Sequence, residues 1–154
     1  MLKWLWLSLL ILLADQVTKH WVVSSMRLYE TVELLPFFQL THVRNEGAAF
    51  SFLSDAGGWQ RWLFVALALV ASGVIVIWLL RLSVQERWQG FALALILGGA
   101  LGNLTDRIRY GYVVDFIDVF YRHWHWPAFN VADSAISVGV AMLALDLLRT
   151  KKGP

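Results

Sequence analysis

Two aspartates in the second half of the chain, Asp115 and Asp133, lie in apolar sequence surroundings that suit acid–base catalysis. Asp115 lies within the apolar segment GYVVDFID, and Asp133 lies just inside a long apolar run. Two carboxylates within reach of one water cannot both ionise easily, so one keeps its proton. The ionised group can take a proton from a water that attacks a peptide carbonyl, while the protonated group polarises that carbonyl. The pair predicts an aspartyl-type protease without a metal or a cofactor.

Each aspartate also has a simpler structural explanation. A carboxylate in the first turn of a helix is favoured by the helix dipole, so Asp133 could be only a helix-start residue. Asp115 could face water on an alternating strand. Both explanations stay open at this point, and the case against them depends on the two side chains sharing one face of the molecule.

Other chemistries have weaker support in the sequence. The chain has no cysteine, which excludes a cysteine nucleophile, a thiolate metal site and disulfides. No Gly-x-Ser-x-Gly motif is present. His123 and His125 form a His-x-His pair, but no clear cysteine or carboxylate ligand set accompanies them, so zinc is a weak alternative. A formal net charge of +2 on scattered basic residues does not favour nucleic-acid binding.

The composition predicts a membrane protein. Of the 154 residues, 58% are hydrophobic and only 16% are charged, against about a quarter charged in a soluble domain. We expect a single all-α membrane domain over residues 1–154, with the N-terminal apolar stretch retained as the first span. Its four transmembrane helices are predicted at about residues 2–23, 62–80, 88–104 and 129–148.

The connections between the spans carry weaker patterns. Residues 30–43 are rich in Thr, Val, Phe and Leu and predict one or two short strands around Pro36. Residues 110–120 are also strand-like. The apolar segment 47–53 is too short to span and predicts a short helix or loop at the membrane interface. We therefore expect a small β-rich loop and an interfacial helix on the outer side.

The number of membrane crossings predicts that the polar residues lie on one side of the membrane. Four spans place both termini on one side and the long connections, 24–58 and 106–128, on the other. The outer side then collects the following residues: Asp15, Lys19, Asn45, Asp106, Asp115, Asp118 and Asp133. Basic residues number six on one side and seven on the other, which leaves the orientation undecided by charge count. Those at the termini and in the short loop favour a cytoplasmic location for both termini.

Several polar residues in the spans have structural explanations. Asp15 and Lys19 are spaced i,i+4, so an intramembrane ion pair accounts for both without a catalytic role. Asn103 and Arg107 share a helix face by the same spacing, and Arg107 could bind backbone carbonyls or a carboxylate. The closely spaced glycines 98, 99 and 102, together with Ala100, allow tight helix packing.

Five motifs occur in order along the chain: DQVTK (15–19), RNEGAAF (44–50), GGALGNLTDR (98–107), VVDF (113–116) and FNVADS (129–134). With these five motifs in this order, the sequence resembles the bacterial lipoprotein signal peptidase family, also called signal peptidase II, over nearly the whole chain. The resemblance implies that Asp115 and Asp133 are the catalytic aspartates. It also implies a set of substrate-binding or supporting residues: Asn45, Gly47, Asn103, Arg107, Asn130, Asp106, Asp15 and Lys19.

The resemblance implies an endopeptidase that removes the signal peptide from a prolipoprotein just before its diacylglyceryl-modified cysteine. It implies a multi-pass enzyme of the bacterial inner membrane whose partners are the prolipoprotein and membrane lipids, with the active site near the periplasmic face. We expect the enzyme to be a monomer. The alternative is a non-enzymatic transporter or assembly subunit with a carboxylate relay. A relay should thread carboxylates through the bilayer, whereas here they cluster at one end. Which aspartate is protonated, the preferred substrate sequence and the mobility of residues 24–58 do not follow from the sequence.

Overall fold

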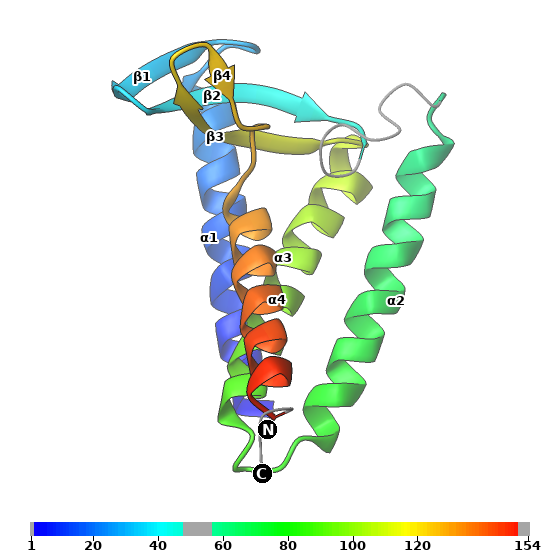
Figure 1. Ribbon diagram of the computed structural model, residues 1–154. Coiled ribbons are helices and arrows are strands. Elements are labelled where there is room, and N and C mark those ends of the chain that lie inside the picture. The colour runs from blue at the N-terminus through cyan, green and yellow to red at the C-terminus, as the bar shows by residue number, and fades with distance from the viewer. Residues whose placement is uncertain (1, 48–56, 151–154) are drawn as a thin grey trace.

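The computed structural model describes residues 2–47 and 57–150. Its helices are η1 (Leu2–Trp4, a short 3-10 helix), α1 (Leu5–Ser25), α2 (Trp59–Arg81), α3 (Arg87–Tyr110) and α4 (Val131–Thr150). The four long helices run roughly alongside one another, with the start of α1 and the end of α4 at the same end (Figure 1). A β-sheet covers the opposite end. The predicted placement of both long connections away from the termini is confirmed.

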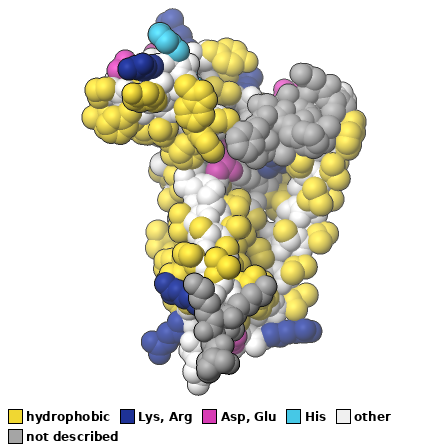
Figure 2. Space-filling model, in the orientation of Figure 1, with side chains coloured by type: hydrophobic (Ala, Val, Ile, Leu, Met, Phe, Trp, Pro, Cys, Tyr) yellow, Lys and Arg dark blue, Asp and Glu magenta, His cyan; other side chains and the backbone are white. Residues whose placement is uncertain are grey.

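The helices α2, α3 and α4 are long and apolar enough to cross a membrane. Helix α1 has a similar length but is not among these span candidates, and its second half carries Asp15, Gln16, Lys19 and His20. The prediction of four spans is therefore confirmed for three helices. Hydrophobic side chains dominate the visible sides of the helices, while the charged ones gather near their ends (Figure 2).

The extramembrane part is a four-stranded antiparallel sheet with the strand order β1-β2-β3-β4. Its strands are β1 (Thr31–Leu35), β2 (Phe38–Asn45), β3 (Val113–Tyr121) and β4 (Trp124–His125). The strands predicted in both connections are confirmed, but the all-α class is wrong, because strands far apart in the sequence pair into one sheet. The predicted interfacial helix at 47–53 lies, beyond Gly47, outside the described residues.

Helix α3 extends further than predicted. It runs to Tyr110 instead of residue 104 and ends at Gly111, whose φ of 86° is readily adopted only by glycine. The Gly111 N–H donates to the carbonyl of Arg107 at 3.2 Å. The charged pair Asp106-Arg107 ends the apolar run of this span, but it does not end the helix. As a result, Asp106 becomes a buried helical residue.

Helix α3 is the central helix and contacts α1, α2 and α4. Small residues allow this close packing, as predicted. A Cβ on Gly98 would lie 2.7 Å from Ile11 Cβ, and one on Gly99 would collide with the carbonyl oxygen of Ala132. Glycines on α3 therefore permit α1 and the start of α4 to approach its backbone, which brings the polar end of α1 near Asp133.

Substituting Gly99 by Ala is expected to destabilise the protein by about 1–3 kcal/mol, because overpacking against backbone cannot be relieved by a rotamer change. The matched control is Gly73→Ala on α2, where an added Cβ meets nothing within 4 Å. That change should be neutral or slightly stabilising, since Ala favours helix over Gly. Thermal unfolding of both variants in detergent would measure the difference. Equal melting temperatures would contradict the packing argument.

The sheet is attached to the helices through a small apolar cluster. Val22 and Met26 at the end of α1 pack with Val114 and Phe116 of β3, and all four are buried. Both faces of the first half of β3 are therefore shielded from solvent. Its first four residues, Val113, Val114, Asp115 and Phe116, are all buried. The alternative that Asp115 faces water on an alternating strand is wrong.

Candidate active site

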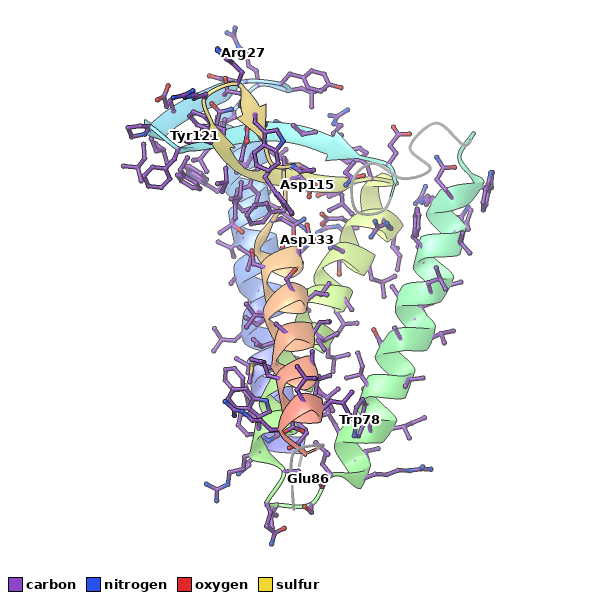
Figure 3. All side chains as sticks on the ribbon, viewed as in Figure 1. Arg27, Trp78, Glu86, Asp115, Tyr121 and Asp133 are labelled. Carbon is purple, nitrogen blue, oxygen red and sulfur yellow. The ribbon has the colours of Figure 1, made fainter. Side chains whose placement is uncertain are left out.

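A cavity of about 520 Å³ lies where the sheet meets the helices. Asp115 from β3 and Asp133 from α4 both line it, and Figure 3 shows the two side chains one above the other at this junction. The expected convergence of these carboxylates is therefore observed. Its other polar lining residues are Asn45, Asn103, Arg107, Ser134 and Ser137. Its large apolar lining residues are Val113, Trp126, Phe129, Ile136 and Val138.

Asp115 is held by two amides. Its Oδ2 accepts a hydrogen bond from Asn45 Nδ2 at 3.0 Å, and its Oδ1 accepts one from Asn130 Nδ2 at 2.7 Å. The side chain is only 2% exposed. Burial, followed by the negative charge of Asp133, raises the pKa of the Asp115 carboxyl from its ordinary 3.8 to about 7. Asp115 can therefore carry a proton near neutral pH.

Asp133 occupies the third position of α4 and forms a reciprocal capping box with Asn130. The backbone N–H of Asp133 donates to Asn130 Oδ1 at 2.9 Å, and the N–H of Asn130 donates to Asp133 Oδ2 at 3.3 Å. The structural explanation of Asp133 as a helix-start residue is therefore confirmed. It does not compete with chemistry, because the cap orients the carboxylate and the helix N-terminus favours its negative charge.

Asn103 links Asp133 to a buried cation. Its Nδ2 donates to Asp133 Oδ1 at 2.8 Å, and its Oδ1 accepts from Lys19 Nζ at 2.9 Å. Because an ammonium group can only donate, Lys19 requires the oxygen of the amide to face it. The amide nitrogen must then face Asp133. Asn130 is fixed in the same way, since its oxygen accepts from the Asp133 N–H and its nitrogen donates to Asp115.

The predicted pair of Asp15 and Lys19 is observed, and it extends to a third residue. Lys19 Nζ lies 2.8 Å from Asp15 Oδ2 and 2.9 Å from Asp106 Oδ2. Relative exposures of 0% for Asp15, 3% for Lys19 and 1% for Asp106 place the group in the interior. Asn103, which lines the cavity, contacts this group through Lys19.

Arg107 reaches the residue that precedes the undescribed segment. Its Nη2 donates to the carbonyl of Gly47 at 2.8 Å, and its guanidinium lies 5.1 Å from the ring centroid of Phe64. Two roles were left open for Arg107, and among the described residues the one observed is binding to a backbone carbonyl. The Gly47 N–H in turn donates to Asn45 Oδ1 at 3.0 Å, which turns the Asn45 amide nitrogen toward Asp115.

The histidine pair lies away from the cavity. His125 Nδ1 is 2.9 Å from Asp118 Oδ2, which also accepts from Gln39 Nε2 at 2.6 Å. Asp118 therefore ties β4 and β2 to β3, although crossing number alone grouped it with the other carboxylates. Within residues 2–47 and 57–150, no group of three or more His, Asp or Glu side chains is arranged to hold a metal ion.

Gln16 and residues 126–129 are not among the site residues predicted from the sequence. The Gln16 amide donates to Asp106 Oδ1 at 2.8 Å and to Asp15 Oδ2 at 3.2 Å. Its position beside Asp15 within an apolar span was an available indication, because polar residues in spans usually have a partner. Residues 126–129 line the cavity, and the bridge between Ile117 and Phe129 holds the end of this segment against β3. No local pattern predicts this contact.

Comparison with known proteins agrees with this architecture. The family model described as signal peptidase (SPase) II matches residues 7–149. The lipoprotein signal peptidase of Pseudoalteromonas atlantica is 50% identical over 150 residues, covering 97% of this chain and 92% of the relative. That of Pseudomonas fluorescens is 55% identical over 153 residues, covering 98% and 90%.

A solved structure described as a bacterial membrane enzyme superposes with a TM-score of 0.89 at 30% identity, covering 97% of this chain and 90% of the other. A second structure with the same description gives a TM-score of 0.83 at 31% identity, covering 95% and 92%. Both the sequence and the fold are therefore shared along nearly the whole chain. The chain belongs to the signal peptidase (SPase) II family of aspartic-type endopeptidases.

Proposed function

We propose that this protein removes signal peptides from diacylglyceryl-modified prolipoproteins, with Asp115 and Asp133 as the catalytic pair. The observation that carries the proposal is the convergence of these two carboxylates on one cavity at the junction of sheet and helices. Each of the four carboxylate oxygens accepts a hydrogen bond from an amide N–H. Such preorganised donors hold both groups in place for chemistry.

The raised pKa of Asp115 assigns it the resting proton, which leaves Asp133, at the start of α4, to act as the base. Asp133 takes a proton from a water, and the oxygen of that water attacks the scissile carbonyl carbon. Asp115 gives its proton to the carbonyl oxygen, which forms a tetrahedral diol. When the C–N bond breaks, Asp133 passes its proton to the leaving nitrogen, and a diol proton returns to Asp115. Both carboxyls are then in their starting states.

The cavity lining suits a substrate that is part peptide and part lipid. The carboxylates and amides lie at the sheet end, while Ile136, Ser137 and Val138 extend the lining along α4 away from the sheet. A diacylglyceryl cysteine presents its scissile bond next to acyl chains, so an active site at the helix ends can receive both. We therefore assign cleavage to the bond just before the lipid-modified cysteine.

The same arrangement supports a location in the bacterial inner membrane. The helices and sheet act as one membrane-embedded protease domain, which we take to be a monomer surrounded by lipid. Both termini are placed on the cytoplasmic side, as the basic residues near them favour, and the sheet and cavity on the periplasmic side. The prolipoprotein would then meet the enzyme after its signal peptide has crossed the membrane.

The test uses purified full-length protein in phospholipid vesicles and one prolipoprotein prepared with and without the diacylglyceryl group. We expect cleavage directly before the modified cysteine, identified by mass spectrometry of both products. The unmodified substrate should react at least ~10²-fold more slowly, because binding energy from remote lipid contacts contributes to kcat/KM. Equal rates for the two substrates, or cleavage elsewhere, would refute the proposed specificity.

A further inference from the structure

The two aspartates of the proposed catalytic pair share an unusual feature: a buried carboxylate binds the backbone N–H of the residue just before each. Asp106 Oδ2 accepts from the N–H of Val114, which precedes Asp115, at 3.2 Å. Asp15 Oδ1 accepts from the N–H of Ala132, which precedes Asp133, at 2.9 Å. The backbone at both catalytic positions is thus anchored to side chains of α3 and α1.

Lys19 connects these two anchors. Its ammonium lies 2.8 Å from Asp15 Oδ2 and 2.9 Å from Asp106 Oδ2, and it donates its third hydrogen bond to Asn103. The three N–H donors of an ammonium group match these three acceptors in number. Through Asn103 the same ammonium also fixes the amide that binds Asp133. Lys19 is therefore connected to both aspartates, although it touches neither.

Gln16 forms a second connection between the anchors. Its amide nitrogen donates to Asp106 Oδ1 and to Asp15 Oδ2. The two carboxylates come from different helices, so their separation depends on what bridges them. Gly102 makes room for this arrangement, because a Cβ there would lie 2.5 Å from Asp15 Oδ2.

We propose that Lys19 is a positioning residue: by bridging Asp15 and Asp106 it sets the spacing between Asp115 and Asp133. This inference rests on the proposed function of the two aspartates. It goes beyond the ion pair expected from the i,i+4 spacing, because that pair would stabilise α1 without any link to catalytic geometry. A buried ion pair is by itself weak evidence for stability, and specifying one arrangement is a recognised alternative role.

Removing Lys19 should affect turnover more than substrate binding. Two buried carboxylates would be left without their cation, and one of them would protonate or move. The backbone N–H groups before Asp115 and Asp133 would then lose their fixed separation. A misplacement of about 1 Å in catalytic groups can lower a rate by roughly 10²-fold. The substrate-facing lining of the cavity does not include Lys19, so KM should change little.

The experiment compares Lys19→Met with Ser8→Ala in full-length protein in vesicles. Ser8 is a matched control, because its buried hydroxyl joins α1 to α3 through the Ala94 carbonyl at 2.9 Å, near the opposite end of α1. Both variants should lower the melting temperature. Below both transitions, Lys19→Met should reduce kcat by about 10²-fold with KM within about threefold, whereas Ser8→Ala should keep kcat within about twofold.

A normal kcat in folded Lys19→Met, or a kcat loss in Ser8→Ala of the same size, would overturn the positioning role. If Lys19→Met does not fold, the kcat of Gln16→Leu is measured in its place. It should lower kcat by roughly threefold to tenfold at unchanged KM, the equivalent of one lost hydrogen bond, and an unchanged kcat would then refute the proposal. Asn variants of Asp115 and Asp133 that still cleave would instead refute the proposed catalytic pair, so the two failures are distinguishable.

Discussion

Replacing either Asp115 or Asp133 by Asn is expected to lower kcat by about 10²–10⁴-fold, the usual contribution of a general acid or base. An amide at position 133 cannot take the proton from water, and one at 115 has no acidic proton to give to the carbonyl oxygen. The rate is measured as cleavage of a diacylglyceryl-modified prolipoprotein by purified variants. The double variant should be hardly slower than either single variant, because the two groups act as a unit.

Both substitutions should leave the protein folded but somewhat less stable. At position 115 the new NH2 group would face one of two amide donors, Asn45 or Asn130, in place of an acceptor. The matched control is Asp118→Asn on the same strand, where the carboxylate binds Gln39 and His125 instead of lining the cavity. This control should keep full cleavage. Normal cleavage by a folded Asp115 or Asp133 variant would rule out the assigned pair.

The rate kcat/KM is expected to fall as the pH rises through about 7. Burial and the charge of Asp133 raise the pKa of Asp115 to about 7, and the mechanism needs Asp115 protonated before substrate binds. Half of the protein is active at that pH, and the active fraction approaches a tenfold decrease per pH unit above it, so it should fall by roughly 50-fold between pH ~7 and ~9. A pH–rate profile in vesicles checks this. A rate that stays flat or increases up to about pH 9 would contradict the protonated role of Asp115.

Stability should depend on pH through the same carboxyl. Its pKa is higher in the folded protein than the ordinary 3.8, so the folded state binds more protons between about pH 4 and 7. Asp115 therefore contributes full stability below about pH 4, loses it progressively up to about pH 7, and causes no further change above. The melting temperature of the wild type minus that of Asp115→Asn should decrease over that range. A difference that increases with pH would show that the pKa is lowered instead.

Most helices and strands of this protein can be predicted from its sequence, because local residue patterns determine them. Long apolar runs predict the helices, and their number places both long connections at the end opposite the termini, which brings Asp115 and Asp133 together. The strand segments around Pro36 and after Gly111 are likewise local, because alternating β-branched and aromatic residues favour extended backbone. The i,i+4 spacing of Asp15 and Lys19 also predicted a true contact.

Only the tertiary structure determines which groups that are distant in the sequence contact each other. Asp15 binds the N–H of Ala132, 117 residues away, and Asp106 extends the ion pair because α3 continues past the point where its apolar run stops. The two connections form one sheet, since strand pairing depends on register between distant segments, which no local pattern contains. Asp133 as a helix cap and Asp133 as a cavity carboxylate were alternatives in the sequence. In the structure Asp133 has both roles, because the capping box that starts α4 also orients its carboxylate toward Asn103 and the cavity.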